Sequence, residues 1–163
     1  MTMPEALEFI QSASWTARKP GLERITELTH RLGNPQKGLR FLHITGTNGK
    51  GSVAAMLSAV LQRAGHRTGF FTSPHLRVYN ERIQIDGVCI SDADFCALAD
   101  ELRTAAVGID PSEFDLLTAM GLAYFQRRAC DLVILEVGLG GRLDSTNVIP
   151  PPEAAVITGI SLE

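Results

Sequence analysis

The chain has 163 residues, of which 45% are hydrophobic and 20% charged, which is enough for one ordinary soluble domain with a core of its own. Its formal net charge is −3 and its acidic and basic residues are interspersed, so no basic block predicts binding to nucleic acid or to a membrane surface. No apolar run approaches the roughly 20 residues that cross a bilayer, no signal peptide is expected, and Cys89, Cys96 and Cys130 predict reduced thiols in a cytoplasmic protein.

The first half of the chain predicts two helices and then a strand, a loop, a helix and a second strand. Apolar residues at helical spacing indicate helices over residues 4–12 and 22–32. Residues 40–45 predict a short strand that runs into a glycine-rich loop, residues 53–65 a helix, and residues 68–72 the next strand. Because two strands joined through a helix run side by side in the same direction, this unit predicts a parallel sheet.

The second half begins with a hairpin signal, Asp86-Gly87, between two short apolar runs at 82–85 and 88–90. Helices are expected over residues 92–106 and 113–128.

Two further strands follow these helices. Residues 132–137 are apolar on both faces, as in a central strand of a parallel sheet. Residues 154–158 predict another strand of the buried type. Because the chain stops directly after it, we expect a truncated polypeptide.

The sharpest chemical feature is the loop Gly46-Thr47-Asn48-Gly49-Lys50-Gly51-Ser52. Its glycines let backbone N–H groups approach a polyphosphate, and the following helix presents unpaired N–H groups at the positive end of its dipole. Lys50 can place its charge against the outer phosphates. The loop departs from the common G-x-x-x-x-G-K-[ST] pattern, since Gly46 lies four residues before Lys50 and Gly51 follows the lysine. The alternative is a glycine-rich turn that binds nothing, but strand, loop, lysine and helix follow in the order that a phosphate site requires.

Glu136 stands at the C-terminal end of the apolar strand, where α/β sheets bind ligands and P-loop enzymes hold a metal. A carboxylate there would bind Mg²⁺ against the phosphates, whereas the alternative is a solvated acid at a strand end. The turn Thr72-Ser73-Pro74-His75-Leu76 leaves the second strand at the same edge of the sheet. Its hydroxyl and imidazole groups can reach a metal or phosphate, although a purely structural turn is the simpler reading.

Three other features are interpreted more plainly. His43, inside the strand before the loop, is expected to be a satisfied core residue, and Trp15 either lines a pocket or packs between helices. The run Gly138-Leu139-Gly140-Gly141 does not fit a dinucleotide fingerprint, because Leu143 stands where the third glycine belongs. We therefore reject a dehydrogenase and expect these glycines to let the chain pass close to a ligand.

Several motifs, in order, closely resemble those of folylpolyglutamate synthases, whose bacterial members are often bifunctional with dihydrofolate synthase. They are G-L-E-R-I (21–25), L-G-N-P-Q (32–36), H-I-T-G-T-N-G-K-G-S (43–52), F-T-S-P-H-L (71–76), N-E-R-I (80–83) and L-E-V-G-L-G-G-R-L-D-S-T-N (135–147). The resemblance runs from about Trp15 to the last residue. The muramyl (Mur) ligases are more distantly similar and share the G-T-N-G-K loop.

The resemblance implies an α/β fold of the P-loop NTPase-like, Mur-ligase central-domain type, with a mostly parallel sheet flanked by helices. Residues 1–163 would be the N-terminal part of the ATP-binding ligase domain, without the C-terminal α/β domain of the family. The loop from Gly46 to Ser52 would bind ATP, and Ser73 and Glu136 would bind Mg²⁺. We assign catalytic roles to Lys50, Glu136 and His75.

The resemblance also implies two walls of a pterin or folate site. One wall would contain Ser112, Glu113, Phe114 and Asp115, with Phe114 stacking on the ring system. The other would contain Leu143, Asp144 and Ser145, with Asp144 bonded to the pterin edge. Residues 12–15 fall where the family has another pterin contact.

The implied reaction is ligation of L-glutamate to a folate or to dihydropteroate through an acyl phosphate made from ATP. We expect small-molecule substrates only, no nucleic acid or membrane, and a monomer when the enzyme is complete. A histidine for a second metal, a carbamylated lysine and the C-terminal domain would lie beyond Glu163, so we expect the chain alone to bind nucleotide without ligating. The alternatives are a muramyl ligase and a non-catalytic nucleotide- or pterin-binding module.

Overall fold

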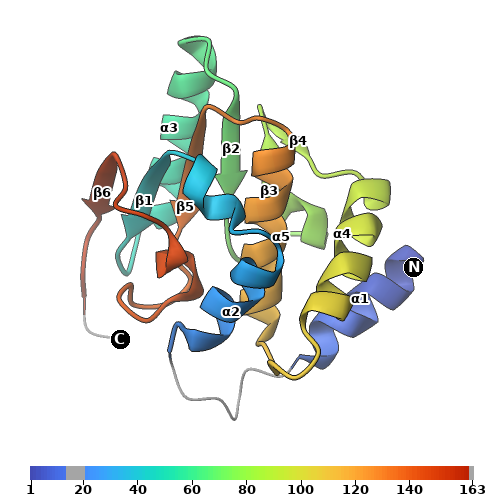
Figure 1. Ribbon diagram of the computed structural model, residues 1–163. Helices are drawn as coiled ribbons and strands as arrows, with labels where there is room; N and C mark the ends of the chain where they lie inside the picture. The colour runs from blue at the N-terminus through green and yellow to red at the C-terminus, as the bar shows by residue number, and fades with distance from the viewer. Residues whose placement is uncertain (14–20, 162–163) are drawn as a thin grey trace.

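The computed structural model describes residues 1–13 and 21–161, which fold around one six-stranded sheet (Figure 1). The strand order is β4-β3-β2-β5-β1-β6. Along β2-β5-β1-β6 all neighbours are parallel, and β3 and β4 add an antiparallel hairpin at one edge. The strands are β1 (Phe41–Thr45), β2 (Thr68–Phe71), β3 (Ile83–Ile85), β4 (Val88–Cys89), β5 (Leu132–Glu136) and β6 (Ala154–Ile157).

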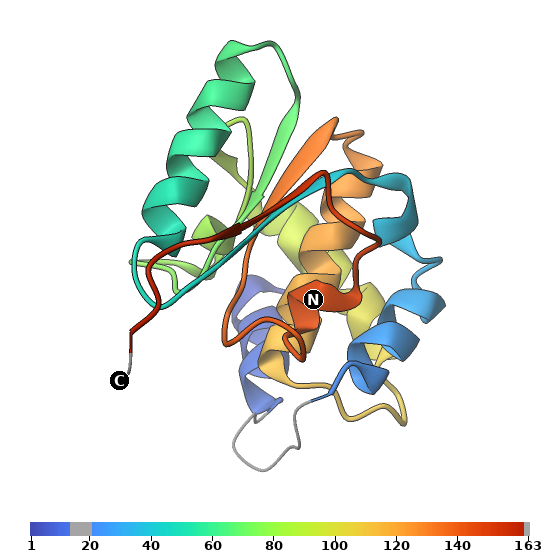
Figure 2. The ribbon, with the colours of Figure 1, turned by 90° about the vertical axis from the view of Figure 1, so that its left-hand side faces the viewer.

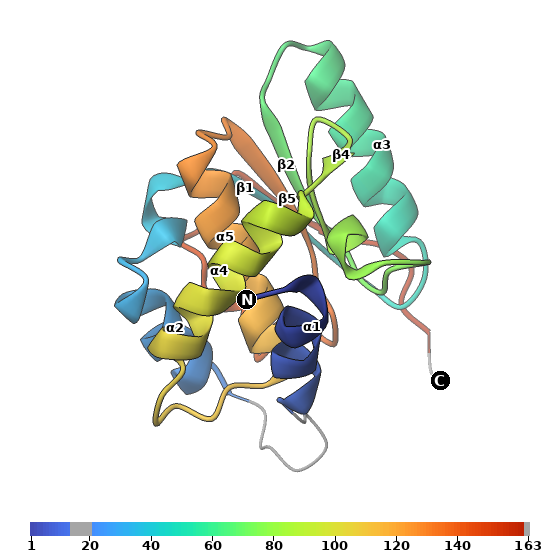
Figure 3. The same cartoon turned by 90° about the vertical axis from the view of Figure 1, so that its right-hand side faces the viewer.

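Helices lie on both faces of the sheet. Within the described ranges, α3 covers one face, and α5 with α1, α2 and α4 covers the other (Figures 2 and 3). The α-helices are α1 (Met3–Ser12), α2 (Glu23–Arg31), α3 (Lys50–Arg63), α4 (Asp92–Ala105) and α5 (Glu113–Arg127). Three short 3-10 helices are η1 (Pro35–Gly38), η2 (Tyr79–Arg82) and η3 (Ser145–Val148).

The main core lies on the α5 side of the sheet. α5 is buried almost all round, because α1, α2 and α4 surround the side of the helix that does not face the sheet. A smaller cluster under α3 contains Ile44, Ala54, Phe70 and Ile134. β5 is buried along its whole length between β2 and β1, which confirms it as a central strand.

The predicted elements are present, and the hairpin has the expected turn. Asp86 and Gly87 have φ values of 50° and 79°, as a type I′ turn requires. α3 begins at Lys50, earlier than its apolar periodicity indicated, because the end of the glycine-rich loop is already helical.

The strand predicted at 154–158 is present, but the prediction that it is buried was wrong. β6 is an edge strand whose residues are exposed or half-exposed, with Ile157 65% accessible. Its apolar composition therefore does not reflect a buried position in this structure. Trp15, and with it half of the predicted pterin contact at 12–15, lies outside the described residues.

Candidate nucleotide and substrate site

The glycine-rich loop joins β1 to α3 with a backbone path that glycine allows. Gly46 has φ 138° and Gly49 has φ 86°, values that residues with a Cβ rarely adopt. A Cβ on Gly46 would also lie 2.0 Å from Thr158 Oγ1. On the same side, the Thr47 amide donates to the Gly159 carbonyl oxygen at 2.9 Å. The segment after β6 therefore packs against the loop and holds its backbone in place.

The start of α3 leaves backbone donors for a ligand. The Val53 amide donates to the Gly49 carbonyl oxygen at 3.0 Å, in the first turn of the helix. The amides of Lys50, Gly51 and Ser52 precede that bond, so helix geometry gives them no acceptor within α3. They lie at the positive end of the helix dipole, an arrangement suited to a phosphate group.

The Lys50 ammonium is held against the loop. Its Nζ donates to the carbonyl oxygens of Gly46, at 2.6 Å, and Thr47, at 3.5 Å. A positive charge and the first amides of α3 therefore lie within one short segment of chain.

Glu136 lies beside this segment and is only 4% exposed. The parallel register pairs Ile44 of β1 with Glu136, so β5 ends next to the strand that leads into the loop. Glu136 Oε2 accepts a hydrogen bond from the Ser73 amide at 3.2 Å. A Cβ built on Gly51 would lie 3.5 Å from Oε1. The structure thus brings together the loop, Glu136 and Ser73, as the sequence predicted, while their binding roles stay predictions.

Thr72 also belongs to this group, although no role was predicted for it. Its hydroxyl donates a hydrogen bond to Glu136 Oε2. Thr72 follows β2, and the register pairs Phe71 with Leu135, so that Thr72 and Glu136 are the next residues on adjacent parallel strands. Aligning the first residues of the two predicted strands, Thr68 and Leu132, pairs Thr72 with Glu136.

His75 lies in a different group of side chains. Its Nδ1 accepts a hydrogen bond from Arg82 Nε at 2.9 Å, and its ring lies 4.4 Å from that of Tyr79, centroid to centroid. The Tyr79 hydroxyl donates to Glu113 Oε1 at 3.1 Å. These contacts connect His75 to the predicted pterin wall, and its catalytic role stays a prediction.

Asp115 joins the two predicted pterin walls. It is 1% exposed, and its Oδ2 accepts hydrogen bonds from the amide and hydroxyl of Ser112, both at 2.8 Å, and from Arg24 Nε at 3.2 Å. Its Oδ1 accepts from the Ser145 hydroxyl at 2.6 Å. Both oxygens therefore bind protein donors, so Asp115 holds the walls together.

Asp144 organises the loop that follows β5. Its Oδ2 accepts from the amides of Gly138, at 3.1 Å, and Leu139, at 2.9 Å. Its Oδ1 accepts from the Thr146 amide at 3.0 Å and from the Thr146 hydroxyl. Leu143 beside it is 53% exposed and is available to a ligand.

Gly138 makes room for Phe114. A Cβ on Gly138 would lie 2.7 Å from Phe114 Cζ, and the Phe114 ring also packs edge-on against Phe71 with centroids 5.8 Å apart. We expected these glycines to let the chain approach a ligand, but at Gly138 the close neighbour is a protein side chain.

His43 completes the loop network from β1. Its Nε2 lies 2.8 Å from Thr146 Oγ1 and must donate, because that hydroxyl donates to Asp144. Burial lowers the pKa of His43 below its ordinary value. The half-buried, hydrogen-bonded ring agrees with the interpretation of His43 as a satisfied core residue.

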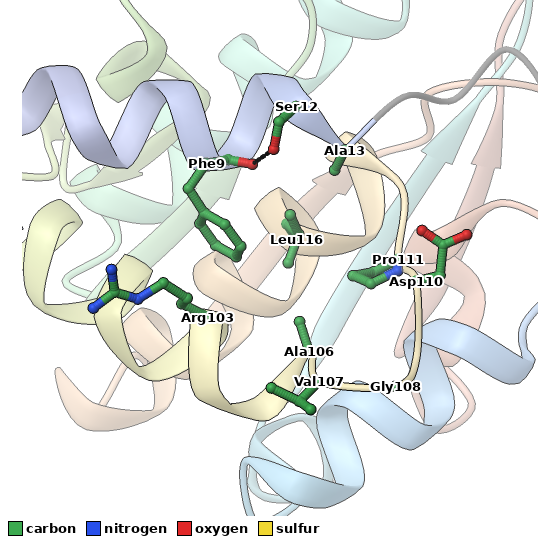
Figure 4. Close-up of a pocket in the computed structure, with 10 residues that line it drawn as sticks. All are labelled: Phe9, Ser12, Ala13, Arg103, Ala106, Val107, Gly108, Asp110, Pro111 and Leu116. Carbon is green, nitrogen blue, oxygen red and sulfur yellow. Dashed lines mark hydrogen bonds between the residues drawn. The ribbon is translucent and has the colours of Figure 1, made fainter.

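A separate cavity of about 500 Å³ lies between the end of α1, the loop after α4, and α5 (Figure 4). Phe9, Leu116 and Pro111 provide apolar surface, and Arg103 lies at one side. None of its lining residues belongs to the glycine-rich loop.

Over residues 1–13 and 21–161, no three His, Cys, Asp or Glu side chains gather as a ready-made metal cluster. In the same ranges no helix has both the length and the apolar character to cross a membrane. The three cysteines are free thiols.

A glycine-rich loop between a strand and a helix, next to a buried carboxylate on the neighbouring strand, defines an α/β domain of the P-loop nucleotide-binding class. No family model matches the chain.

Curated relatives give the family. The chain is 45% identical over 149 residues to the dihydrofolate synthase/folylpolyglutamate synthase of Bacillus subtilis, a match that covers 87% of this chain and 34% of the relative. It is 39% identical over 170 residues to the folylpolyglutamate synthase of Lacticaseibacillus casei, covering 100% of this chain and 40% of the relative. The chain belongs to the folylpolyglutamate and dihydrofolate synthase family and corresponds to its N-terminal part.

Solved structures agree with this assignment. An FPGS–AMPPCP–folate complex superimposes with a TM-score of 0.95 at 39% identity, over 100% of this chain and 41% of the other. Escherichia coli FolC in complex with DHPP and ADP superimposes with a TM-score of 0.91 at 34% identity, over 100% of this chain and 39% of the other. The chain thus spans about two fifths of these structures.

Proposed function

We propose that the protein provides the ATP-binding part of an ATP- and Mg²⁺-dependent ligase that adds L-glutamate to a folate, to dihydropteroate, or to both. The observation that carries the proposal is the meeting of Lys50, the first amides of α3 and Glu136 at one edge of the sheet. The ligands of the solved relatives, AMPPCP with folate and ADP with DHPP, are consistent with a nucleotide and a pterin in this family.

The residues at this edge fit a divalent cation. The two hydrogen bonds that the described chain makes to Glu136 both go to Oε2, and the carboxylate lies beside Gly51 at the start of α3. Glu136, the hydroxyl of Ser73 and nucleotide phosphates would supply the oxygen ligands that Mg²⁺ prefers. When bound, the ion neutralises charge on the phosphate oxygens.

The chain's own groups hold the nucleotide for phosphoryl transfer. Lys50 and the amides of Gly51 and Ser52 bind the outer phosphates and stabilise their growing negative charge. A carboxylate oxygen of the acceptor attacks the terminal phosphorus, and ADP leaves, which yields an acyl phosphate. The glutamate amine then attacks the acyl carbon, phosphate leaves, and one proton is lost as the amide forms.

The acceptor site in this proposal lies between the two walls that Asp115 joins. Phe114 and Leu143 provide apolar contact for the pterin ring, and Asp144 shapes the loop beside it, since both of its oxygens accept hydrogen bonds from the protein. We place the enzyme in the cytoplasm as a monomer without nucleic-acid or membrane partners.

The test uses the product of the complete reading frame with Mg-ATP, L-glutamate, and either dihydropteroate or tetrahydrofolate. ADP release and product mass are followed together. A mass gain of one glutamyl unit on either acceptor supports the proposal and identifies the activity. A folded protein with no gain on either acceptor contradicts it and favours a muramyl-type substrate or a non-catalytic module.

A further inference from the structure

We propose that Thr72 is a positioning residue for the metal of this site. Its hydroxyl occupies Oε2 of the Glu136 carboxylate and fixes the carboxylate so that Oε1 is left for a ligand, and it thereby sets the affinity for the divalent cation that accompanies the nucleotide. This inference rests on the proposed nucleotide site and adds a residue to it.

The backbone places Thr72 rigidly. It comes directly after β2, where the parallel register with β5 brings it beside Glu136, although the two residues are 64 apart in the sequence. On the other side its amide donates to the Arg82 carbonyl oxygen at 3.0 Å. The side chain is β-branched and hence restricted at χ1. The hydroxyl is therefore held in place both by its backbone and by its own rotamer.

The Thr72 hydroxyl is one of two protein donors that orient the carboxylate. It donates to Glu136 Oε2, and the Ser73 amide donates to the same oxygen at 3.2 Å. Both donors lie on Oε2, so Oε1 accepts no hydrogen bond from the described chain, and the carboxylate lies beside Gly51, with Oε1 3.5 Å and Oε2 3.7 Å from a Cβ built there. Without the hydroxyl, only the Ser73 amide would hold this orientation, and a buried carboxylate has little water to replace the lost donor.

The expected effect is on metal affinity. Removing a partner that orients a metal ligand typically lowers metal affinity by about 10–100-fold. We therefore expect Thr72→Val to raise the Mg²⁺ concentration for half-maximal binding of a fluorescent ADP by about 10-fold or more. Binding of the same nucleotide in EDTA should change much less, because Lys50 and the amides of α3 are untouched.

The chain offers a matched control on the same strand. Thr68 begins β2, is fully buried, and donates its hydroxyl to the His66 carbonyl oxygen at 3.1 Å, at the end of β2 away from Glu136. Thr68→Val makes the same chemical change there and should leave the Mg²⁺ dependence unaltered. Thr72→Ser keeps the hydroxyl and should lose much less metal affinity than Thr72→Val.

The experiment titrates Mg²⁺ in the presence of fluorescent ADP, and Mn²⁺ binding followed by electron paramagnetic resonance provides a direct second readout. A second cycle places Thr72→Val in a Glu136→Gln background, where no further loss is expected if Thr72 acts through Glu136. Should the valine variant fail to fold by circular dichroism, Thr72→Ala and Thr72→Ser are compared instead, with the loss expected in alanine only.

Each outcome decides the proposal. It is overturned if Thr72→Val binds Mg²⁺ within twofold of wild type, if Thr68→Val shifts equally, or if serine does not restore binding. A wild-type protein that binds ADP without any divalent dependence overturns both this inference and the metal site proposed above. A wild-type protein that shows normal Mg²⁺ dependence, together with an unaffected Thr72→Val variant, overturns this inference alone.

Discussion

Two buried carboxylates show how the candidate nucleotide site around Glu136 differs from the predicted pterin walls around Asp115. Glu136 is 4% exposed and Asp115 is 1% exposed, so the two are buried alike. The hydrogen bonds that the described chain makes to Glu136 fall on one oxygen, and the carboxylate lies beside Gly51 at the start of α3. Asp115 has protein donors on both oxygens, from Ser112, Arg24 and Ser145.

The difference shows that burial alone does not identify a ligand-binding carboxylate. What separates the two is how many of the lone pairs the protein itself occupies. By this measure Glu136 is available to a cation, and Asp115 stabilises the fold around the site. Substitutions at the candidate nucleotide site and substitutions at the pterin walls should therefore affect different measurements.

The largest effect is expected on the nucleotide side, from Lys50→Ala. Its ammonium is the cation of the loop, so its loss removes an electrostatic stabiliser of the transferring phosphoryl group. We expect turnover to fall at least roughly 10²-fold in the complete enzyme, measured as ADP release. Lys37→Ala, at an exposed position in η1, is the control and should keep normal turnover. Near-normal turnover of Lys50→Ala would remove the assignment of Lys50.

The second prediction separates the two carboxylates by stability. In Asp115→Asn an NH₂ group replaces one of the two carboxylate oxygens, both of which accept from protein donors. The NH₂ group therefore faces at least one donor without an acceptor, and we expect a loss of about 3 kcal/mol in the free energy of unfolding. In Glu136→Gln the amide oxygen can still accept from Thr72, and we expect a loss below about 1 kcal/mol together with weakened Mg²⁺ binding. Urea unfolding at neutral pH measures both. Equal losses in the two variants would contradict the distinction.

The third prediction tests the packing of the pterin walls. Gly138→Ala places a Cβ against the Phe114 ring, which also contacts Phe71, so the ring must shift. We expect a destabilisation of about 1–3 kcal/mol in urea unfolding. Gly38→Ala is the matched control, because a Cβ there has open space around it, and it should lie within about 0.5 kcal/mol of wild type. A neutral Gly138→Ala would show that Phe114 is not confined as described.

The smallest expected effect is a pH dependence from His43. Burial lowers its pKa in the folded state below the ordinary value of 6.5. Between these two pKa values the unfolded chain binds more protons, so stability increases as pH rises toward 6.5 and then levels off. The contribution is at most about 1.4 kcal/mol per pH unit.

His43→Gln keeps an N–H donor for Thr146 but does not titrate. Urea midpoints from about pH 5 to pH 7 should therefore depend less steeply on pH in this variant. An unchanged slope would show that His43 does not contribute to the pH dependence of folding.

The sequence by itself determined the elements and the chemical character of the loop. The turn type at Asp86-Gly87 and the apolar run of β5 both depend on neighbours within a few residues, so local rules identify them. The order of strand, glycine loop, lysine and helix likewise indicated the nucleotide site, because these parts follow one another directly along the chain.

Only the tertiary structure decided which side chains form hydrogen bonds with each other. Thr72 meets Glu136 through a strand register that joins residues 64 apart, and Asp115 meets Ser145 across 30 residues. The same limit explains the error at β6, since its apolar residues do not reveal that, within the described ranges, β6 pairs with β1 alone. Residue type records what a side chain can bond with, whereas the packing of distant segments determines which partner it has and whether an oxygen is left for a ligand.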